Sequence, residues 1–80
     1  MKEFVEFIIK NLVDKPDEVH VNEITGKQII IFELRVGKGD MGKVIGRSGQ
    51  TARSIRTLMT AVAAKQRKRA VLEILEDKSE

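Results

Sequence analysis

The segment Val44-Ile45-Gly46-Arg47-Ser48-Gly49-Gln50-Thr51-Ala52 decides the fold of this 80-residue chain. It holds two glycines three positions apart, with a basic residue and a small hydroxyl residue between them. The residues on either side favour helix, so the glycines predict a short loop between two helices. Glycines leave little side-chain bulk, which lets another molecule's backbone approach closely. The start of the following helix and the Arg47 guanidinium both favour an anion there, so the loop is predicted to contact phosphate.

Basic residues concentrate around this loop. The formal net charge of the whole chain is +3, but it is −3 over residues 1–34, +9 over residues 35–69 and −3 over residues 70–80. A basic segment between acidic ends predicts a surface that binds a polyanion. For Arg53 and Arg56, a solvated helix face is the alternative interpretation.

The spacing of apolar residues predicts an α+β fold. The expected elements are helices at 2–13, 41–45 and about 50–69, strands at 19–24, 28–36 and 71–75, and a charged tail from about residue 76. A right-handed crossover places the last strand parallel to the second one. We therefore expect one domain over residues 1–80, a two-layer α-β-β-α-α-β arrangement with a three-stranded mixed sheet and three helices on one face.

Three individual residues carry further structural expectations. Asp40 precedes the short helix and is predicted to accept hydrogen bonds from the N–H groups of its first turn. Phe4 and Phe32 fall on apolar stripes and are predicted to lie in the core. Because Tyr and Trp are absent, the chain lacks the aromatic platforms of RRM and OB-type RNA-binding surfaces.

Other phosphate motifs fail on specific residues. The segment 37–42 matches G-x-G-x-x-G, but no acidic residue lies between Asp40 and Glu73 to hold a ribose. A Walker A loop fails because Val44 stands where magnesium needs Ser or Thr. With no cysteine and no catalytic constellation, the sequence predicts no enzyme activity, no cofactor and no metal site. Without a membrane-length apolar run, a cytoplasmic protein is expected.

From about Gln28 to Leu75, the order strand, helix, G-x-x-G loop, helix and strand resembles the minimal motif of the KH superfamily, and the N-terminal helix and hairpin are similar to its type II arrangement. Leu12-Val13-Asp14-Lys15-Pro16-Asp17-Glu18-Val19 and the loop are similar to the KhpA (YlqC) family of small bacterial KH proteins. The resemblance implies that the chain binds single-stranded RNA and that the loop grips its backbone. The RNA-binding residues it implies are Gly46, Arg47, Ser48, Gly49, Lys43, Ile45, Arg53 and Arg56.

The resemblance also implies partners. Members of this family are expected to act in post-transcriptional regulation or as RNA chaperones, either as homodimers or with a second KH protein of the KhpB (Jag-like) type. The alternative function is a protein-interaction or dimerisation module that uses the KH fold and binds little RNA. The small residues Ala61, Val62, Ala63 and Ala64 are compatible with a subunit contact and with internal packing.

Overall fold

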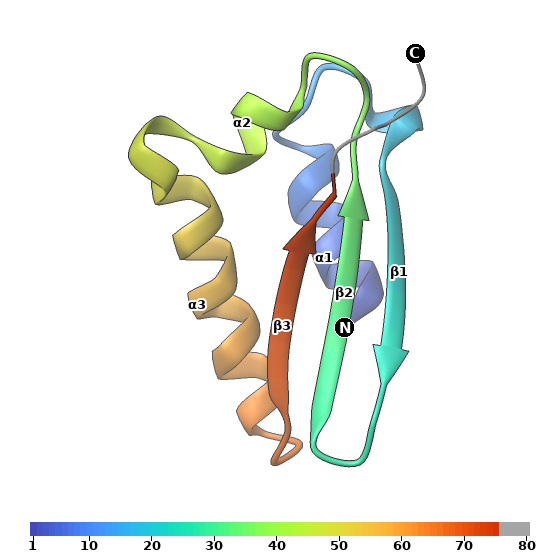
Figure 1. Cartoon of the computed structure of the whole chain (residues 1–80), viewed down its shortest axis with the longest axis vertical. Coiled ribbons are helices and arrows are strands. Elements are labelled where there is room, and N and C mark those ends of the chain that lie inside the picture. Colours follow the sequence, from blue (N-terminus) through green and yellow to red (C-terminus); the bar gives the residue numbers. More distant parts are fainter. Residues whose placement is uncertain (76–80) are drawn as a thin grey trace.

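The predicted order of helices and strands is confirmed. The computed structural model describes residues 1–75, and the tail predicted from about residue 76 lies outside them. Figure 1 shows the path of the chain. Its elements are α1 (Lys2–Lys10), the 3-10 turn η1 (Pro16–Glu18), β1 (His20–Thr25), β2 (Ile29–Arg35), α2 (Met41–Ile45), the 3-10 turn η2 (Arg47–Gly49), α3 (Gln50–Ala64) and β3 (Arg69–Ile74).

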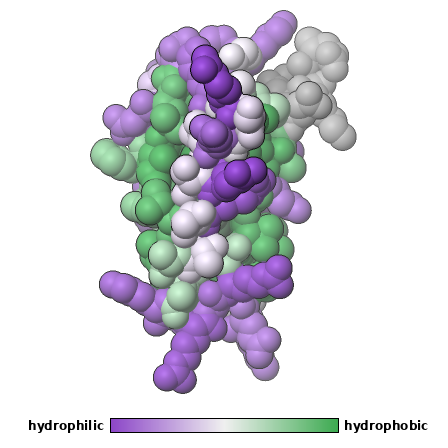
Figure 2. Space-filling view, turned by 90° about the vertical axis from the view of Figure 1, so that its left-hand side faces the viewer, coloured by the Kyte–Doolittle hydropathy of each residue, from purple (hydrophilic) through white to green (hydrophobic). Residues whose placement is uncertain are grey.

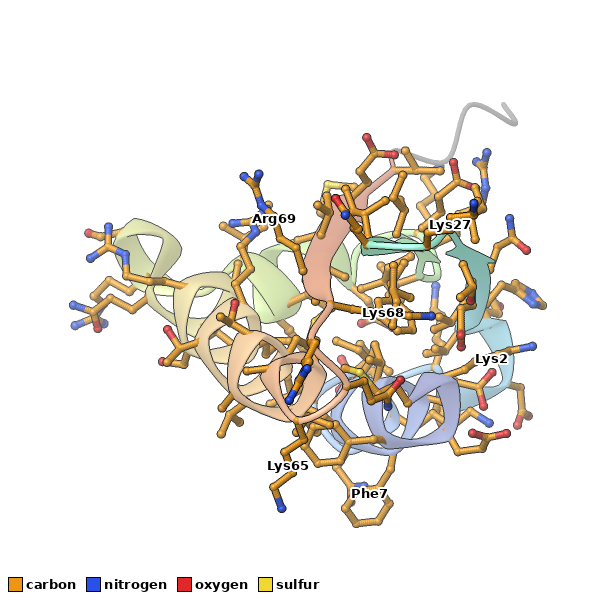
Figure 3. The ribbon with its side chains drawn as sticks, turned by 90° about the horizontal axis from the view of Figure 1, so that it is seen from below. Lys2, Phe7, Lys27, Lys65, Lys68 and Arg69 are labelled. Atoms are coloured by element: carbon orange, nitrogen blue, oxygen red, sulfur yellow. The ribbon has the colours of Figure 1, made fainter. Side chains whose placement is uncertain are left out.

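The sheet has the strand order β1-β2-β3 and is mixed, as expected. β1 pairs antiparallel with β2, with Val21 opposite Leu34, and β2 pairs parallel with β3, with Phe32 opposite Leu72. The crossover through α2 and α3 is what makes the second pairing parallel. Figures 1 and 3 show α1 and α3 on the same face of the sheet, so within residues 1–75 no helix covers the other face.

The core lies between the sheet and these helices. Alternate residues of β2 point inward, because side chains of a strand alternate between its two faces. They meet apolar residues of α1 and α3 that recur at three- and four-residue intervals. The buried set includes Ile30, Phe32, Leu34 and Val36 from the second strand region, Val5 and Ile9 from α1, and Ile55 and Met59 from α3. Burial of each such side chain contributes about 1.5–3 kcal/mol, and together they hold α3 against the sheet.

The long helix is shorter than the sequence predicts. α3 ends at Ala64, not near residue 69, because the chain turns sharply to bring the Arg69 N–H to the Gln28 carbonyl at 2.9 Å. The Lys68 N–H donates to the Ala63 carbonyl at 3.1 Å, and Arg67 takes a left-handed φ of 57°. This is a Schellman-type helix end with arginine where glycine is usual.

The predicted capping role of Asp40 is wrong. Its side chain makes no capping hydrogen bond with α2. Asp40 is 2% exposed, and its carboxylate accepts hydrogen bonds from the backbone N–H groups of Asp14 at 3.2 Å and Lys15 at 3.0 Å. Asp40 therefore fastens the connection between α1 and β1 to the start of α2, and so fixes the segment that leads into the glycine loop.

The predicted burial of Phe4 is also wrong, whereas Phe32 is fully buried. The buried stripe of α1 runs through Val5 and Ile9, which turns Phe4 and Phe7 toward solvent with 38% and 68% of their surface exposed. A nine-residue helix packed on one narrow stripe leaves neighbouring apolar positions outside the core.

Candidate nucleic-acid interface

The G-x-x-G loop has a conformation that its glycines make possible. Gly46, Ser48 and Gly49 have positive φ values of 76°, 56° and 74°. A Cβ added to Gly46 would lie 2.6 Å from the Thr51 Cβ and 2.9 Å from the Thr51 nitrogen, so no larger residue fits there. A Cβ added to Gly49 would meet no atom within 4 Å. The backbone at Gly49 thus borders open space that a ligand can enter.

Hydrogen-bond donors are available at this loop. The Gly49 N–H donates to the Gly46 carbonyl at 3.1 Å, and the Gln50 N–H donates to the Arg47 carbonyl. Within residues 1–75, the N–H groups of Arg47 and Ser48 donate to no protein acceptor. No side chain caps the start of α3, so its positive dipole end is open to an anion. The loop can therefore hold a phosphate with backbone donors and the exposed Arg47 side chain.

A groove of about 600 Å³ begins beside the loop and runs between α3 and β3. The α-helical wall is apolar near the loop, and Arg56 lies further along it. The strand wall carries one acidic residue, Glu73, which the sequence did not single out. The lining residues are Ile45, Gly49, Ala52, Arg56, Leu72, Glu73, Ile74 and Leu75.

The groove exposes unpaired backbone groups of β3. β3 is an edge strand whose neighbour is β2. In a parallel pair, every second residue of a strand directs both its N–H and its C=O toward the neighbouring strand, and the residues between direct theirs away from it. The N–H groups of Arg69 and Leu75 donate to Gln28 and Leu34, so the odd-numbered residues face β2. The even-numbered residues face the groove, where the Leu72 carbonyl accepts from an Arg56 guanidinium nitrogen at 3.4 Å. This edge offers donors and acceptors to a base lying in the groove.

The structure brings most of the predicted site residues to one place. Ile45, Gly49 and Arg56 line the groove, and Arg47 and Ser48 follow Gly46 in the loop at its end. Two predicted residues lie apart from the groove lining. Arg53 is exposed on α3, and the Lys43 ammonium pairs with the Asp14 carboxylate at 3.4 Å.

The strand wall of the groove is what the sequence analysis missed. Leu72, Ile74 and Leu75 look like ordinary core residues of a final strand, since nothing in their side chains indicates a site. The signal that could have found them is topological. A right-handed crossover makes the last strand an edge strand directly beside α3.

The surface around α3 combines polar and apolar regions. Figure 2 looks at the outer side of this helix and shows a polar ridge with apolar bands on both sides. Exposed apolar side chains on the helices include Phe4, Phe7 and Leu58. Within residues 1–75, no group of three potential ligands could hold a metal ion. Over the same residues, no helix is long and apolar enough to span a membrane.

An α-β-β-α-α-β domain with a G-x-x-G loop between two helices, beside a groove at the sheet edge, is a KH domain. The comparison with protein families narrows this class. The family model "KhpA/KhpB, KH domain" matches residues 2–74, and the chain belongs to this family.

Several relatives carry the name RNA-binding protein KhpA. The protein from Chlamydia trachomatis is 53% identical over 78 residues, covering 98% of this chain and all of the relative. Those from Clostridium perfringens and Borreliella burgdorferi are 56% and 57% identical, covering 94% and 92% of this chain and 100% and 90% of their own lengths. No solved structure gave a significant match. Membership of this family confirms the prediction that the chain is not an enzyme.

Proposed function

We propose that this chain binds single-stranded RNA, with the Gly46–Gly49 loop holding the sugar–phosphate backbone and the bases lying in the groove. The open space outside Gly49, next to the unpaired N–H groups of Arg47 and Ser48, carries the proposal. A phosphate can come against the loop backbone only where no side chain intervenes, and Gly49 meets that requirement.

Each predicted residue then has a distinct role. Arg47 supplies a charge to the phosphate and Ser48 a hydroxyl, and both are exposed. Ile45 provides apolar surface at the loop end of the groove. Arg56 reaches phosphate or base edges from the helix wall, and Arg53 contributes from the neighbouring turn of α3. Lys43 attracts RNA at longer range, since its ammonium group is already paired with Asp14.

Useful affinity is expected to need more than one copy. A KH groove holds about four nucleotides, so a single domain binds weakly and with little sequence preference. A second copy, or a KH protein of the KhpB type, would raise the effective concentration of the second binding site. We propose on this basis a homodimer or a heterodimer with such a protein, acting in the cytoplasm as a post-transcriptional regulator or RNA chaperone. The family model, which covers both KhpA and KhpB, supports this partnership.

The test is a double variant of the loop, Arg47→Asp with Ser48→Asp. Aspartate tolerates the left-handed conformation of position 48 better than most residues do, so the variant is expected to fold. The matched control is Lys2→Asp with Lys10→Gln on exposed positions of α1, which removes the same total charge. The loop variant should lose binding to an oligouridine, and the control should keep most of it.

The salt dependence of the wild-type chain gives a second measure. If three or four phosphates are neutralised, the logarithm of the binding constant should fall with the logarithm of salt concentration at a slope of about −2 to −3. Equal binding by the loop variant and the control would remove the loop from the proposed interface. Binding that does not respond to salt would contradict the phosphate contacts altogether.

One observation favours the protein-interaction alternative. Phe7 has 68% of its surface exposed, and Phe4 and Leu58 are also exposed on the helices. Phe4 and Phe7 are three residues apart on α1 and so are neighbours on its surface, and contiguous exposed apolar patches commonly mark a protein contact. Crosslinking of RNA to the chain in cells separates the two functions, because a module that only dimerises would recover no RNA. Phe7→Ser should change the oligomeric state measured by sedimentation if this alternative holds.

A further inference from the structure

The groove does not end where the first cavity ends. A second depression of about 330 Å³ continues it between α3 and β3, away from the glycine loop. The two share Arg56 and Leu72, so they form one track between α3 and β3. We call this second depression the lower groove. It is lined by Arg56, Met59, Thr60, Arg69, Ala70, Val71 and Leu72.

Basic residues gather where the lower groove opens. The connection between α3 and β3 carries Lys65, Arg67 and Lys68, and β3 begins with Arg69; we call these four residues the basic end. Figure 2 shows the hydrophilic side chains projecting there, and Figure 3 views this end directly. In Figure 3 Arg69 lies on the side of β3 nearer to α3, whereas Lys27 lies across the sheet.

The charge of this end is not neutralised by the described part of the chain. Within residues 1–75 the ion pair is that of Lys43 with Asp14, and neither Arg56 nor Arg69 has a carboxylate oxygen within 4 Å. Arg69 is exposed. A guanidinium without a carboxylate partner at the rim of this depression suits a phosphate, which it can bind through two parallel hydrogen bonds.

The track is longer than a KH clamp needs. The strand wall of the track runs from Leu75 beside the glycine loop to Arg69 at the other end, which is about 20 Å at roughly 3.3 Å per residue. If the nucleotides keep the spacing of about 3.4 Å found along one strand of a duplex, this length corresponds to roughly six nucleotides, against the four that a KH loop and groove hold. About two nucleotides would therefore extend past the first cavity toward the basic end.

We infer that the lower groove and Arg69 form a second RNA subsite, which takes the phosphates of about two nucleotides beyond those held by the glycine loop. This inference rests on the proposed RNA binding and adds the direction of the strand along α3. Arg69 contacts phosphate, Arg56 links the two halves of the groove, and Thr60 offers a hydroxyl. The remaining basic residues of this end raise the local potential.

The test compares oligouridines of four and ten nucleotides on three chains: the wild type, Arg69→Gln and Lys27→Gln. Both variants remove one charge from an exposed position at the same end of the molecule. A longer RNA has more binding registers, which raises its affinity without changing the salt slope. The decisive quantity is therefore the salt slope on the ten-nucleotide RNA, where each lost phosphate contact removes about 0.7. Circular dichroism checks that each variant is folded.

We expect Arg69→Gln to reduce the slope for the long RNA by about 0.7 and to leave binding of the short RNA unchanged, while Lys27→Gln alters neither slope. Arg69→Lys should restore most of the affinity for the long RNA, because it keeps the charge. Equal effects of Arg69→Gln and Lys27→Gln on this slope would show that Arg69 acts only through the overall positive potential of the protein, and would overturn the subsite. So would an unchanged slope in Arg69→Gln. Failure of the wild type to bind either RNA would instead refute the proposed function.

Discussion

Replacing the two loop glycines separately by alanine distinguishes a packing role from a ligand-binding role. Both have left-handed φ values, 76° at Gly46 and 74° at Gly49, yet their surroundings differ. The methyl group of Gly46→Ala would collide with Thr51, including its backbone nitrogen at 2.9 Å. The methyl group of Gly49→Ala would enter open space.

The expected losses of stability follow from these surroundings. In Gly49→Ala the left-handed conformation costs about 1–2 kcal/mol, and the lower conformational entropy of the unfolded chain offsets about 0.4–1 kcal/mol of this. The net loss is about 1 kcal/mol, a fall in Tm of roughly 4–8 °C for a domain of this size. Gly46 also has a ψ of 176°, a region that only glycine readily occupies. With the steric overlap added, Gly46→Ala should lose about 2–6 kcal/mol.

The assay is thermal unfolding followed by circular dichroism, together with titration of a fluorescent oligouridine. Gly49→Ala should remain folded at 25 °C and lose about tenfold in affinity, equivalent to about 1.4 kcal/mol, because its methyl group occupies the space assigned to phosphate. A Gly49→Ala chain that binds RNA as well as the wild type would refute the close approach at this position. Equal stabilities of the two variants would refute the packing argument for Gly46.

Two further substitutions test the elements that position the site. Asp40→Ala should lower the free energy of unfolding, measured in urea, by about 2 kcal/mol or more, because it leaves the N–H groups of Asp14 and Lys15 without their acceptor. Asp40→Asn should lower it less. An unchanged urea midpoint for the alanine variant would contradict the role of the carboxylate. Arg67→Gly should raise the free energy of unfolding by about 0.5–1 kcal/mol in the same measurement, since glycine removes the cost of the left-handed φ of 57°. A loss of stability would instead show that the arginine side chain stabilises the turn.

The sequence is sufficient to predict the architecture because hydrophobic spacing and crossover handedness act on whole elements. The alternation of Ile30, Phe32 and Leu34 predicts β2 and its buried face, and the structure buries all three. The short helix at 41–45 is predicted with its observed bounds. Glycines mark both limits of this helix, because Gly39 lies shortly before it and Gly46 directly follows it.

The errors lie where tertiary contacts outweigh local preference. Lys65, Gln66 and Arg67 have good helix propensity, yet the chain leaves the helix at Ala64 so that β3 can pair with β2. Asp40 looks like a helix cap, and its carboxylate instead meets backbone donors about 25 residues earlier in the chain. The strand wall of the groove is equally invisible to side-chain patterns, because its chemistry belongs to backbone groups of β3.

The parallel pairing of β2 with β3 has a consequence for solubility. It leaves the peptide groups of Ala70, Leu72 and Ile74 on an open edge, and open edges are sites where strands of two molecules can join and aggregate. Here the Arg56 guanidinium donates a hydrogen bond to the Leu72 carbonyl, and Arg69 lies on β3 with Leu72. Two copies meeting edge to edge would bring these guanidinium groups together, so the charges that attract a polyanion also oppose self-aggregation while the groove is empty.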